Sequence, residues 1–286
     1  MNLTNLQPSP PDARDHIASL PVVPSLPSVD LKPLVTEVEN QYNWNTCTAN
    51  AGCSALELLY NKNKIQVDLS RLFLYYYTRK LGNITGDGGS YPRDIGKALK
   101  TYGVCPELSW DYTVDNLEKE PAADVVTLAN AYKIVSYERL AGENLSQIKN
   151  ALSQGIPVLL SIAVHAGMYS LLGDWKTHTW NYTTSPTNSL LGWHEVLVIG
   201  YDDASGRLLV ENSWGSLWGD GGFFGIPYDM TTSPSFGELW VLTPNYNLGA
   251  DVVPVPTPAK TLSTIDIVFR ILLFVCLVSA AFNFIR

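Results

Sequence analysis

The sequence is poor in cysteine, with four in 286 residues: Cys47, Cys53, Cys105 and Cys276. Four cysteines are too few for a disulfide scaffold of this size, and no pair is spaced as Cys-x-x-Cys, so a zinc site has no support. Cys47 and Cys53 would lie about 240° apart on one helix and could not bridge each other, whereas a bridge from Cys53 to Cys105 stays open. We expect four free thiols in a reducing compartment, and no metal or other cofactor.

Positive charge is also scarce. The chain has 19 Lys and Arg against 27 Asp and Glu, a net charge of -8, and no basic cluster. A nucleic-acid partner is therefore not expected, because binding to a phosphate backbone needs a positively charged surface. With 46% hydrophobic and 16% charged residues, the chain has enough apolar material for one large domain or two closely packed lobes.

A secretory signal is missing from the first residues, which have no continuous apolar core. Residues 1–25 are instead rich in proline and show little periodicity, so we predict an extended N-terminal arm. Without a secretory signal, the folded part of the chain is expected to remain on the cytosolic side of any membrane.

Hydrophobic periodicity places helices first and strands later. Helical spacing is clearest over residues 47–59, 70–81, 95–103 and 144–155, and short β-rich runs cover residues 157–164, 195–202, 207–214 and 238–242. This order favours an α+β domain over residues 26–243, in which a helical lobe faces an antiparallel, barrel-like β lobe.

The C-terminal end has a different composition. Residues 244–263 contain several prolines and read as a linker, and residues 264–286 are strongly apolar, without charge from Ile271 to Phe282. A spanning helix needs roughly 20 apolar residues. We predict a transmembrane tail anchor in a lipid bilayer at residues 264–286, with a helix packed on the domain or on a partner as the alternative.

One cysteine stands where a loop turns into a helix. In the stretch QYNWNTCTANAGC, Cys47 follows polar residues and precedes small ones, so it falls in the first turn of a buried helix with Asn45 or Thr46 as N-cap. The aligned peptide dipoles at a helix N-terminus lower the pKa of a thiol and make it nucleophilic. The alternative is that Cys47 is a small buried apolar residue.

A cysteine nucleophile needs an imidazole as base and a third group to orient it. His194 precedes the predicted strand 195–202, and Asn212 ends the following strand after the turn-forming segment DDASG. A hairpin would bring both side chains to one end, where Asn212 accepts from one ring nitrogen and the other faces the thiol. Trp214 could shield that hydrogen bond from water.

Three segments, QYNWNTCTANA, WHEVLVIGYD and ENSWGSLWGDGGFFGI, resemble the signature regions of papain-like cysteine peptidases, and are most similar to the branch found in bacteria, phages and large DNA viruses. The resemblance implies a two-lobed fold and assigns a role to each matching residue. Cys47 would be the nucleophile, His194 the general base and later acid, and Asn212 the group that orients His194. Gln41 would donate to the oxyanion, and Trp214 would cover the His–Asn pair.

The segment GDGGSYP, residues 86–92, resembles the family's glycine-rich stretch. The resemblance implies that Gly88 and Gly89 pair with an extended polypeptide substrate in β fashion, with Tyr91 and Pro92 near the pocket for the residue two before the cut. By itself the segment also reads as an ordinary surface turn.

Two departures from the family pattern bear on the site. Glu195 directly follows His194, and we expect it to point to solvent, with a pocket that favours a basic side chain as the alternative. The family has a long helical inhibitory propeptide, which the 25 residues before residue 26 are too short to form, so we expect either that the arm occupies the groove or that location restrains the enzyme.

The function we predict is a cysteine endopeptidase that works through a thioester acyl-enzyme. A transpeptidase or ligase with the same triad is one alternative, since a thioester can be resolved by an amine as well as by water. A membrane- or virion-associated structural module that kept the fold and lost turnover is the other.

Overall fold

The computed structural model describes residues 5–141, 144–179 and 182–248. Its α-helices are α1 (Cys47–Lys62), α2 (Arg71–Gly82), α3 (Pro92–Thr101), α4 (Ala123–Ala129) and α5 (Asn144–Ser153). Its strands are β1 (Ser28–Asp30), β2 (Ile134–Arg139), β3 (Val158–His165), β4 (Leu190–Asp202), β5 (Arg207–Glu211), β6 (Phe223–Pro227) and β7 (Phe236–Pro244). Short 3-10 helices are η1 (Lys32–Leu34), η2 (Glu107–Ser109), η3 (Val114–Asn116), η4 (Ala166–Ser170) and η5 (Tyr228–Thr232).

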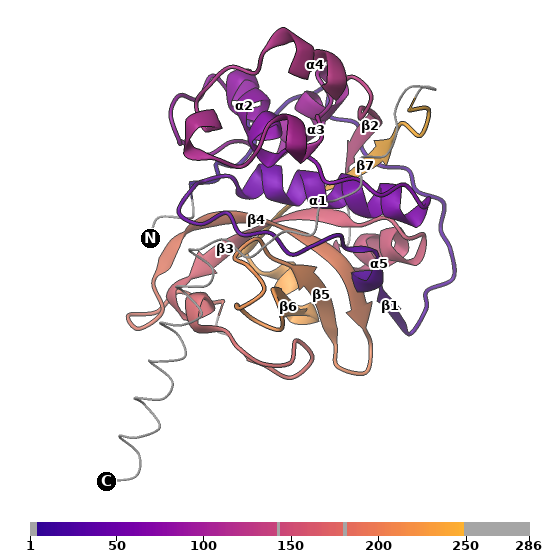
Figure 1. Cartoon of the computed structure of the whole chain (residues 1–286). Coiled ribbons are helices and arrows are strands. Elements are labelled where there is room, and N and C mark those ends of the chain that lie inside the picture. The colour runs from indigo at the N-terminus through magenta and orange to yellow at the C-terminus, as the bar shows by residue number, and fades with distance from the viewer. Residues whose placement is uncertain (1–4, 142–143, 180–181, 249–286) are drawn as a thin grey trace. The chain divides into compact units, whose positions relative to one another are not determined.

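The strands form one antiparallel sheet in the order β2-β7-β3-β4-β5-β6, with β1 paired to β4. The predicted α+β class is confirmed. Among the described strands no pairing joins β2 to β6, the two ends of this order. Strand β2 pairs with β7 alone and packs beside α3, which extends that edge toward the helices (Figure 1).

Helix α1 lies between the other helices of the helical part and the sheet (Figure 1). It is buried on nearly every side, as its small residues predict. Gly52 shows how closely α1 meets α2 and α3, because a Cβ there would lie 2.6 Å from Ile95 Cγ2 and 3.1 Å from Leu74 Cδ2. The predicted central, tightly packed helix is confirmed.

Each face of the sheet buries its own hydrophobic core. Along β4, Leu197 and Ile199 belong to the core shared with the helices, whereas Val196 and Val198 belong to the core on the opposite face, with α5. Successive side chains of a strand point to opposite faces, so one strand serves both cores. The two cores correspond to the two predicted lobes.

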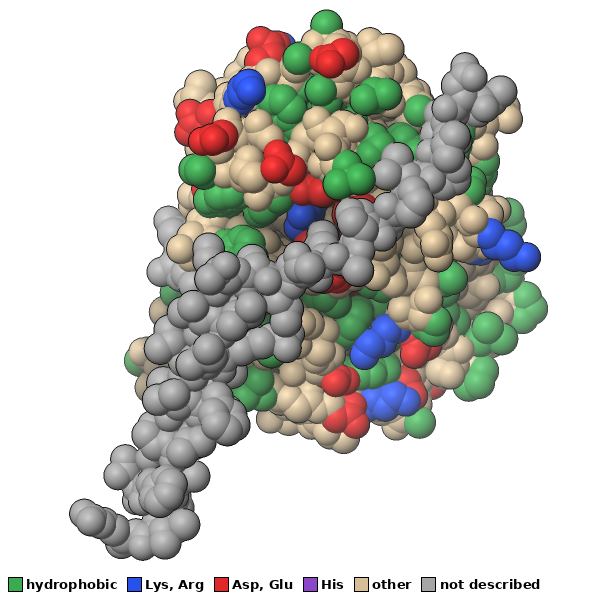
Figure 2. All heavy atoms as spheres, viewed as in Figure 1, with side chains coloured by type: hydrophobic (Ala, Val, Ile, Leu, Met, Phe, Trp, Pro, Cys, Tyr) green, Lys and Arg blue, Asp and Glu red, His purple; other side chains and the backbone are tan. Residues whose placement is uncertain are grey.

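The surface keeps the acidic character of the sequence. Figure 2 shows acidic side chains gathered over the upper, helical part of the viewed face, in line with the net charge of -8.

All four predicted helices and all four predicted strands are present, with ends shifted by a few residues, while α4, β1, β2 and β6 were not predicted. The predicted anchor at residues 264–286, and residues 249–263 of the predicted linker, lie outside the described residues. Within the described ranges, no helix is long and apolar enough to cross a membrane.

Candidate active site

Cys47 is the first residue of α1, and Thr46 is the N-cap residue. Of the two predicted N-cap candidates, Thr46 has that position, although its side chain makes no cap hydrogen bond. Its hydroxyl instead pairs with the Tyr112 hydroxyl at 2.6 Å and accepts from Asn50 Nδ2 at 3.0 Å. The first backbone N–H groups of α1 are thus left without a side-chain cap, at the position of the Cys47 thiol.

Asn45, the other N-cap candidate, ties the loop before Cys47 to the glycine-rich turn. Its backbone N–H donates to the Asp87 carboxylate at 3.0 Å, and its Nδ2 donates to the Asp87 carbonyl at 2.8 Å. The Tyr75 hydroxyl donates to Asp87 Oδ1 at 2.7 Å and accepts from the Gly89 N–H at 3.0 Å. Asp87 therefore fixes this turn beside the loop that carries Cys47, a role that the sequence did not reveal.

His194 on β4 and Asn212 just after β5 meet as the predicted hairpin requires. His194 Nε2 lies 2.8 Å from Asn212 Oδ1, and the same oxygen accepts from the Ser213 backbone N–H at 2.9 Å. A backbone N–H can only donate, so Asn212 presents its oxygen, and His194 Nε2 must carry the hydrogen. In a neutral imidazole, Nδ1 is then the basic nitrogen, and it is buried without a hydrogen-bond partner in the structure as described.

Aromatic rings enclose this pair. The Trp214 ring lies 5.0 Å from the His194 ring, stacks on Tyr169 at 5.0 Å and meets the edge of Trp218 at 5.0 Å between centroids. A hydrogen bond shielded from water in this way is stronger than an exposed one. Trp214 thus lies over the His194 ring, within a cluster of aromatic side chains.

Gln41 is fully buried and links the two halves of the site. Its backbone N–H donates to the Ser213 carbonyl at 2.8 Å, and its Oε1 accepts from the Ser213 hydroxyl at 2.6 Å. Its Nε2 donates to the Trp44 carbonyl at 2.8 Å. An amide nitrogen has two hydrogens. One Nε2 hydrogen of Gln41 therefore remains for another acceptor.

The Cys47 thiol is 2% exposed and His194 is fully buried. Burial raises the pKa of Cys47 to about 12, although the backbone amide of Glu195, the residue after His194, acts on the thiol and lowers its pKa. Burial also lowers the pKa of His194 to about 4. In the part of the chain that the structure describes, no hydrogen bond joins the sulfur to His194. Both shifts favour the neutral forms, a thiol at Cys47 and an uncharged imidazole at His194.

Comparison with known proteins identifies the protein family of this chain. Residues 26–235 match the family described as "Papain family cysteine protease". The chain belongs to the papain family of cysteine proteases. An uncharacterized peptidase C1-like protein of Acanthamoeba polyphaga mimivirus is 30% identical over 227 residues, covering 75% of this chain and 71% of that protein. Cysteine proteinase 1 of Entamoeba histolytica is 30% identical over 207 residues, which cover 70% of this chain but only 62% of that protein.

A solved structure supports the same assignment. Xylellain, a cysteine protease from Xylella fastidiosa, matches with a TM-score of 0.74 and 28% identity, over 83% of this chain and 94% of that one. The predicted family and the predicted papain-like fold are confirmed, and the chain is a cysteine peptidase.

In this papain-family chain, the N-terminal arm runs past the site. Asn5 forms a parallel β-bridge with Trp193, and a Cβ on Gly89 would lie 2.3 Å from the Asn5 carbonyl oxygen. Gly89 also has φ +80, which favours glycine, so both the close contact with Asn5 and the backbone conformation exclude a side chain. The next arm residue, Leu6, is 3% exposed. The arm backbone therefore passes between Gly89 and the residue directly before His194.

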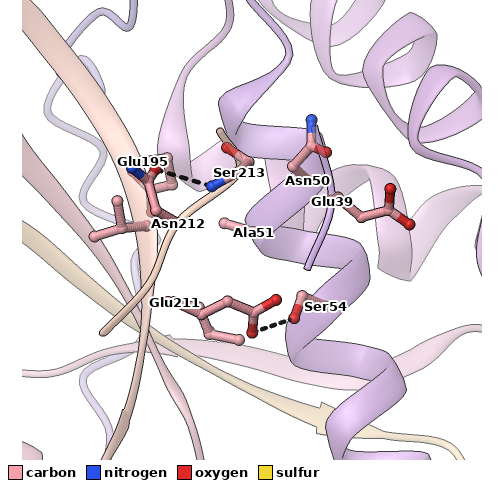
Figure 3. Close-up of a pocket in the computed structure, with 10 residues that line it drawn as sticks. Glu39, Asn50, Ala51, Ser54, Glu195, Glu211, Asn212 and Ser213 are labelled. Atoms are coloured by element: carbon pink, nitrogen blue, oxygen red, sulfur yellow. Dashed lines mark hydrogen bonds between the residues drawn. The ribbon is translucent and has the colours of Figure 1, made fainter. Parts of the chain in front are cut away.

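Glu195 does not point to solvent, and that expectation is wrong. The residue is 1% exposed, and its Oε2 accepts from the Ser161 hydroxyl at 2.7 Å. The reason is the alternation of β4, which puts Glu195 on the same face as Leu197, toward α1. Figure 3 shows the small pocket on this side of the peptidase, with Glu195 of β4 and Asn212, just after β5, across from Ala51 of α1.

Tyr91 is the N-cap residue of α3, and Pro92 is its buried first residue. A Cβ on Gly82 would lie 3.0 Å from the Tyr91 ring, so this ring packs against the end of α2. A substrate pocket at Tyr91 and Pro92 stays a prediction.

Cys47, Cys53 and Cys105 are free and buried, as predicted, and Cys276 lies outside the described residues. Within those described ranges, no group of three or more His, Cys, Asp or Glu side chains is placed to hold a metal ion.

Proposed function

We propose that this papain-family chain is an endopeptidase that works through Cys47, His194 and Asn212. His194 Nδ1 takes the proton of the Cys47 thiol as the sulfur attacks the substrate carbonyl carbon. His194 then gives that proton to the leaving amine, and the acyl group stays on the sulfur as a thioester. Water releases the acyl group with His194 as base. The observation that carries the proposal is the hydrogen bond from His194 to Asn212, which leaves Nδ1 free to act.

Two donors are available for the oxyanion. One is the backbone N–H of Cys47, and the other is the Nε2 hydrogen of Gln41 that Trp44 does not use. Donors of this kind are commonly worth about 3 to 4 kcal/mol each, because they face the charge that develops in the transition state. Gly88 and Gly89 would pair with the extended substrate, and Tyr91 and Pro92 would line the pocket for the residue two before the cut.

On this proposal, the N-terminal arm inhibits the enzyme by occupying the groove that would bind the substrate. Its support is the path of Asn5 between Gly89 and Trp193, which is the path proposed for a substrate. Further contacts fasten it, since the Ser9 hydroxyl accepts from the Arg93 backbone N–H at 3.1 Å and Asp15 pairs with the Arg93 guanidinium at 2.6 Å. Of the two restraints considered from the sequence, this favours occupation of the groove over location.

Cleavage of a peptide library by the full-length protein, with the arm intact and after its removal, tests the endopeptidase activity. The wild type should cut internal peptide bonds, and the Cys47→Ala variant should cut none. Product masses with and without an added amine would show whether the acyl group goes to water or to the amine. Equal cleavage by wild type and Cys47→Ala would contradict the proposal.

We also propose that residues 264–286 anchor the enzyme in a lipid bilayer with the catalytic domain on the cytosolic side, or on a virion membrane. The support is the apolar, uncharged run from Ile271 to Phe282. Full-length protein should stay in the membrane pellet after carbonate extraction, and a chain lacking residues 264–286 should move to the supernatant. Recovery of the full-length protein as a soluble monomer would refute the anchor.

A further inference from the structure

Glu195 has a carboxylate oxygen that the fold leaves unused. One oxygen, Oε2, accepts from the Ser161 hydroxyl at 2.7 Å, while the other, Oε1, is buried and has no hydrogen-bond partner among the described residues. An unsatisfied buried polar atom is costly, and such atoms are rare in folded proteins. Glu195 is therefore poised to accept a hydrogen bond from a group that the chain itself does not supply.

This oxygen belongs to the surroundings of the reactive sulfur. The backbone amide of Glu195 acts on the Cys47 thiol, and the Glu195 carboxyl also acts on that thiol electrostatically. Glu195 follows His194 directly, and its partner Ser161 stands opposite it on β3. A ligand that reached Oε1 would lie next to the bond that Cys47 attacks.

A second carboxyl lies on the same face. Glu238 acts electrostatically on Glu195, and its own oxygens accept from the Ser9 backbone N–H at 2.6 Å and from Trp240 Nε1 at 3.0 Å. In the structure as described, no lysine or arginine forms an ion pair with either carboxyl. Arg93, whose guanidinium lies 5.9 Å from the Trp240 ring, is paired with Asp15 of the arm. Among the described residues, neither Glu195 nor Glu238 thus has an ion-pair partner, and Ser9 of the arm lies on Glu238.

We propose that Glu195, supported by Glu238, selects substrates that carry a basic side chain, arginine or lysine, among the residues just before the scissile bond. This inference rests on the proposed peptidase function. A guanidinium offers several hydrogen-bond donors and a positive charge, which matches a carboxylate oxygen that lacks a partner beside a second carboxyl. A hydrogen bond to a charged group is worth about 1.5 to 3 kcal/mol, so we expect a preference of about 10- to 150-fold.

A bound cation would also act on the charge of Glu195. Burial raises the pKa of this carboxyl well above its ordinary range. A guanidinium beside Oε1 would favour the carboxylate form and lower that pKa again.

The test uses full-length protein from which the arm is removed after folding. A recognition sequence for a site-specific protease is inserted in the exposed stretch 24–27, and the released arm is separated from the folded chain. Peptide pairs differ only at one of the three residues before the cut, arginine in one peptide and citrulline in the other. Citrulline has nearly the same shape as arginine but no charge, so the ratio of kcat/KM within a pair isolates the charge.

At one of these positions, the wild type should cleave the arginine peptide about tenfold or more faster in kcat/KM than its citrulline partner. The ratio should fall toward one in Glu195→Gln and persist in Glu118→Gln, an exposed control. A wild-type ratio near one at all three positions would overturn the proposal, and this comparison needs no variant to fold. A ratio that survives in Glu195→Gln would overturn the role of Glu195.

Failure of the peptidase function would look different. In that case neither peptide of any pair would be cut and the specificity proposal would fall with the function. Cleavage of both peptides at equal rates would leave the peptidase function intact and refute the specificity alone, as would happen if Arg93, freed from Asp15, neutralised the two carboxyls.

Discussion

Glu211 should make the protein less stable as pH rises. The residue is 5% exposed, and its Oε2 accepts from the Ser54 hydroxyl of α1 at 2.7 Å (Figure 3). Burial, assisted by the nearby charge of Glu39 and opposed by the Ser54 hydrogen bond, raises the pKa of Glu211 from 4.5 to about 8. The folded state therefore holds a proton that the unfolded state has lost. The stability that Glu211 contributes is fully present below pH 4.5 and is lost as pH rises through about 8.

The Glu211→Gln substitution removes this titration and keeps an oxygen for Ser54. One pH unit between the two pKa values corresponds to about 1.4 kcal/mol. Between pH 5 and pH 8, the free energy of unfolding of Glu211→Gln should therefore rise relative to wild type by about 3 kcal/mol. Urea unfolding at pH 5, 6.5 and 8 measures the difference, with Glu118→Gln as an exposed control that should follow the wild type. If the wild-type and Glu211→Gln stabilities kept a constant difference across these pH values, the reasoning about this buried carboxyl would be refuted.

Two further predictions concern the site. Asn212→Ala removes the acceptor of the His194 Nε2 hydrogen and should lower kcat about ten- to a hundredfold with little change in KM. The reason is that the lost hydrogen bond becomes stronger as the imidazole becomes charged. Steady-state kinetics after arm removal measure kcat and KM, and an unchanged kcat would contradict the prediction. Cleavage of the chain within the exposed stretch 24–27, followed by removal of the arm, should raise the rate of Cys47 labelling by a peptide epoxide at least about tenfold, because the arm passes between Gly89 and Trp193. Equal labelling rates before and after removal would show that the arm does not restrain the site.

The parts of the site that local sequence could predict are those held by one element or one hairpin. Cys47 falls at the start of α1 because a polar loop gives way to small helix-forming residues there. His194 and Asn212 meet because a short turn-rich segment sets the pairing of β4 with β5. These features depend on residues close together in the chain, so periodicity and turn chemistry were sufficient.

The errors and omissions arose where contacts with residues far along the chain determine the structure. Thr46 has the predicted N-cap position, but its hydroxyl pairs with Tyr112, 66 residues further along the chain, and does not cap α1. Glu195 is buried because its face of β4 meets α1, and the alternation of β4 alone does not say which face that is. Strands β2 and β6 are short and carry little alternation of their own. Their pairing with β7 and β5 decides their structure, and such pairing is not encoded locally.

The most direct test asks whether Cys47 and His194 are the reacting pair. The protein is folded at full length, the arm is then removed, and the product is treated with a cysteine-directed peptide epoxide at pH 6. Cys47, Cys53 and Cys105 are all buried thiols, so the last two serve as internal controls. Peptide mapping by mass spectrometry should find the adduct on Cys47, at a rate that drops sharply in His194→Ala, and should find none on the other two. An adduct spread evenly over the three cysteines, or a Cys47 that stays unlabelled, would contradict the assignment of Cys47 and His194 as the reacting pair.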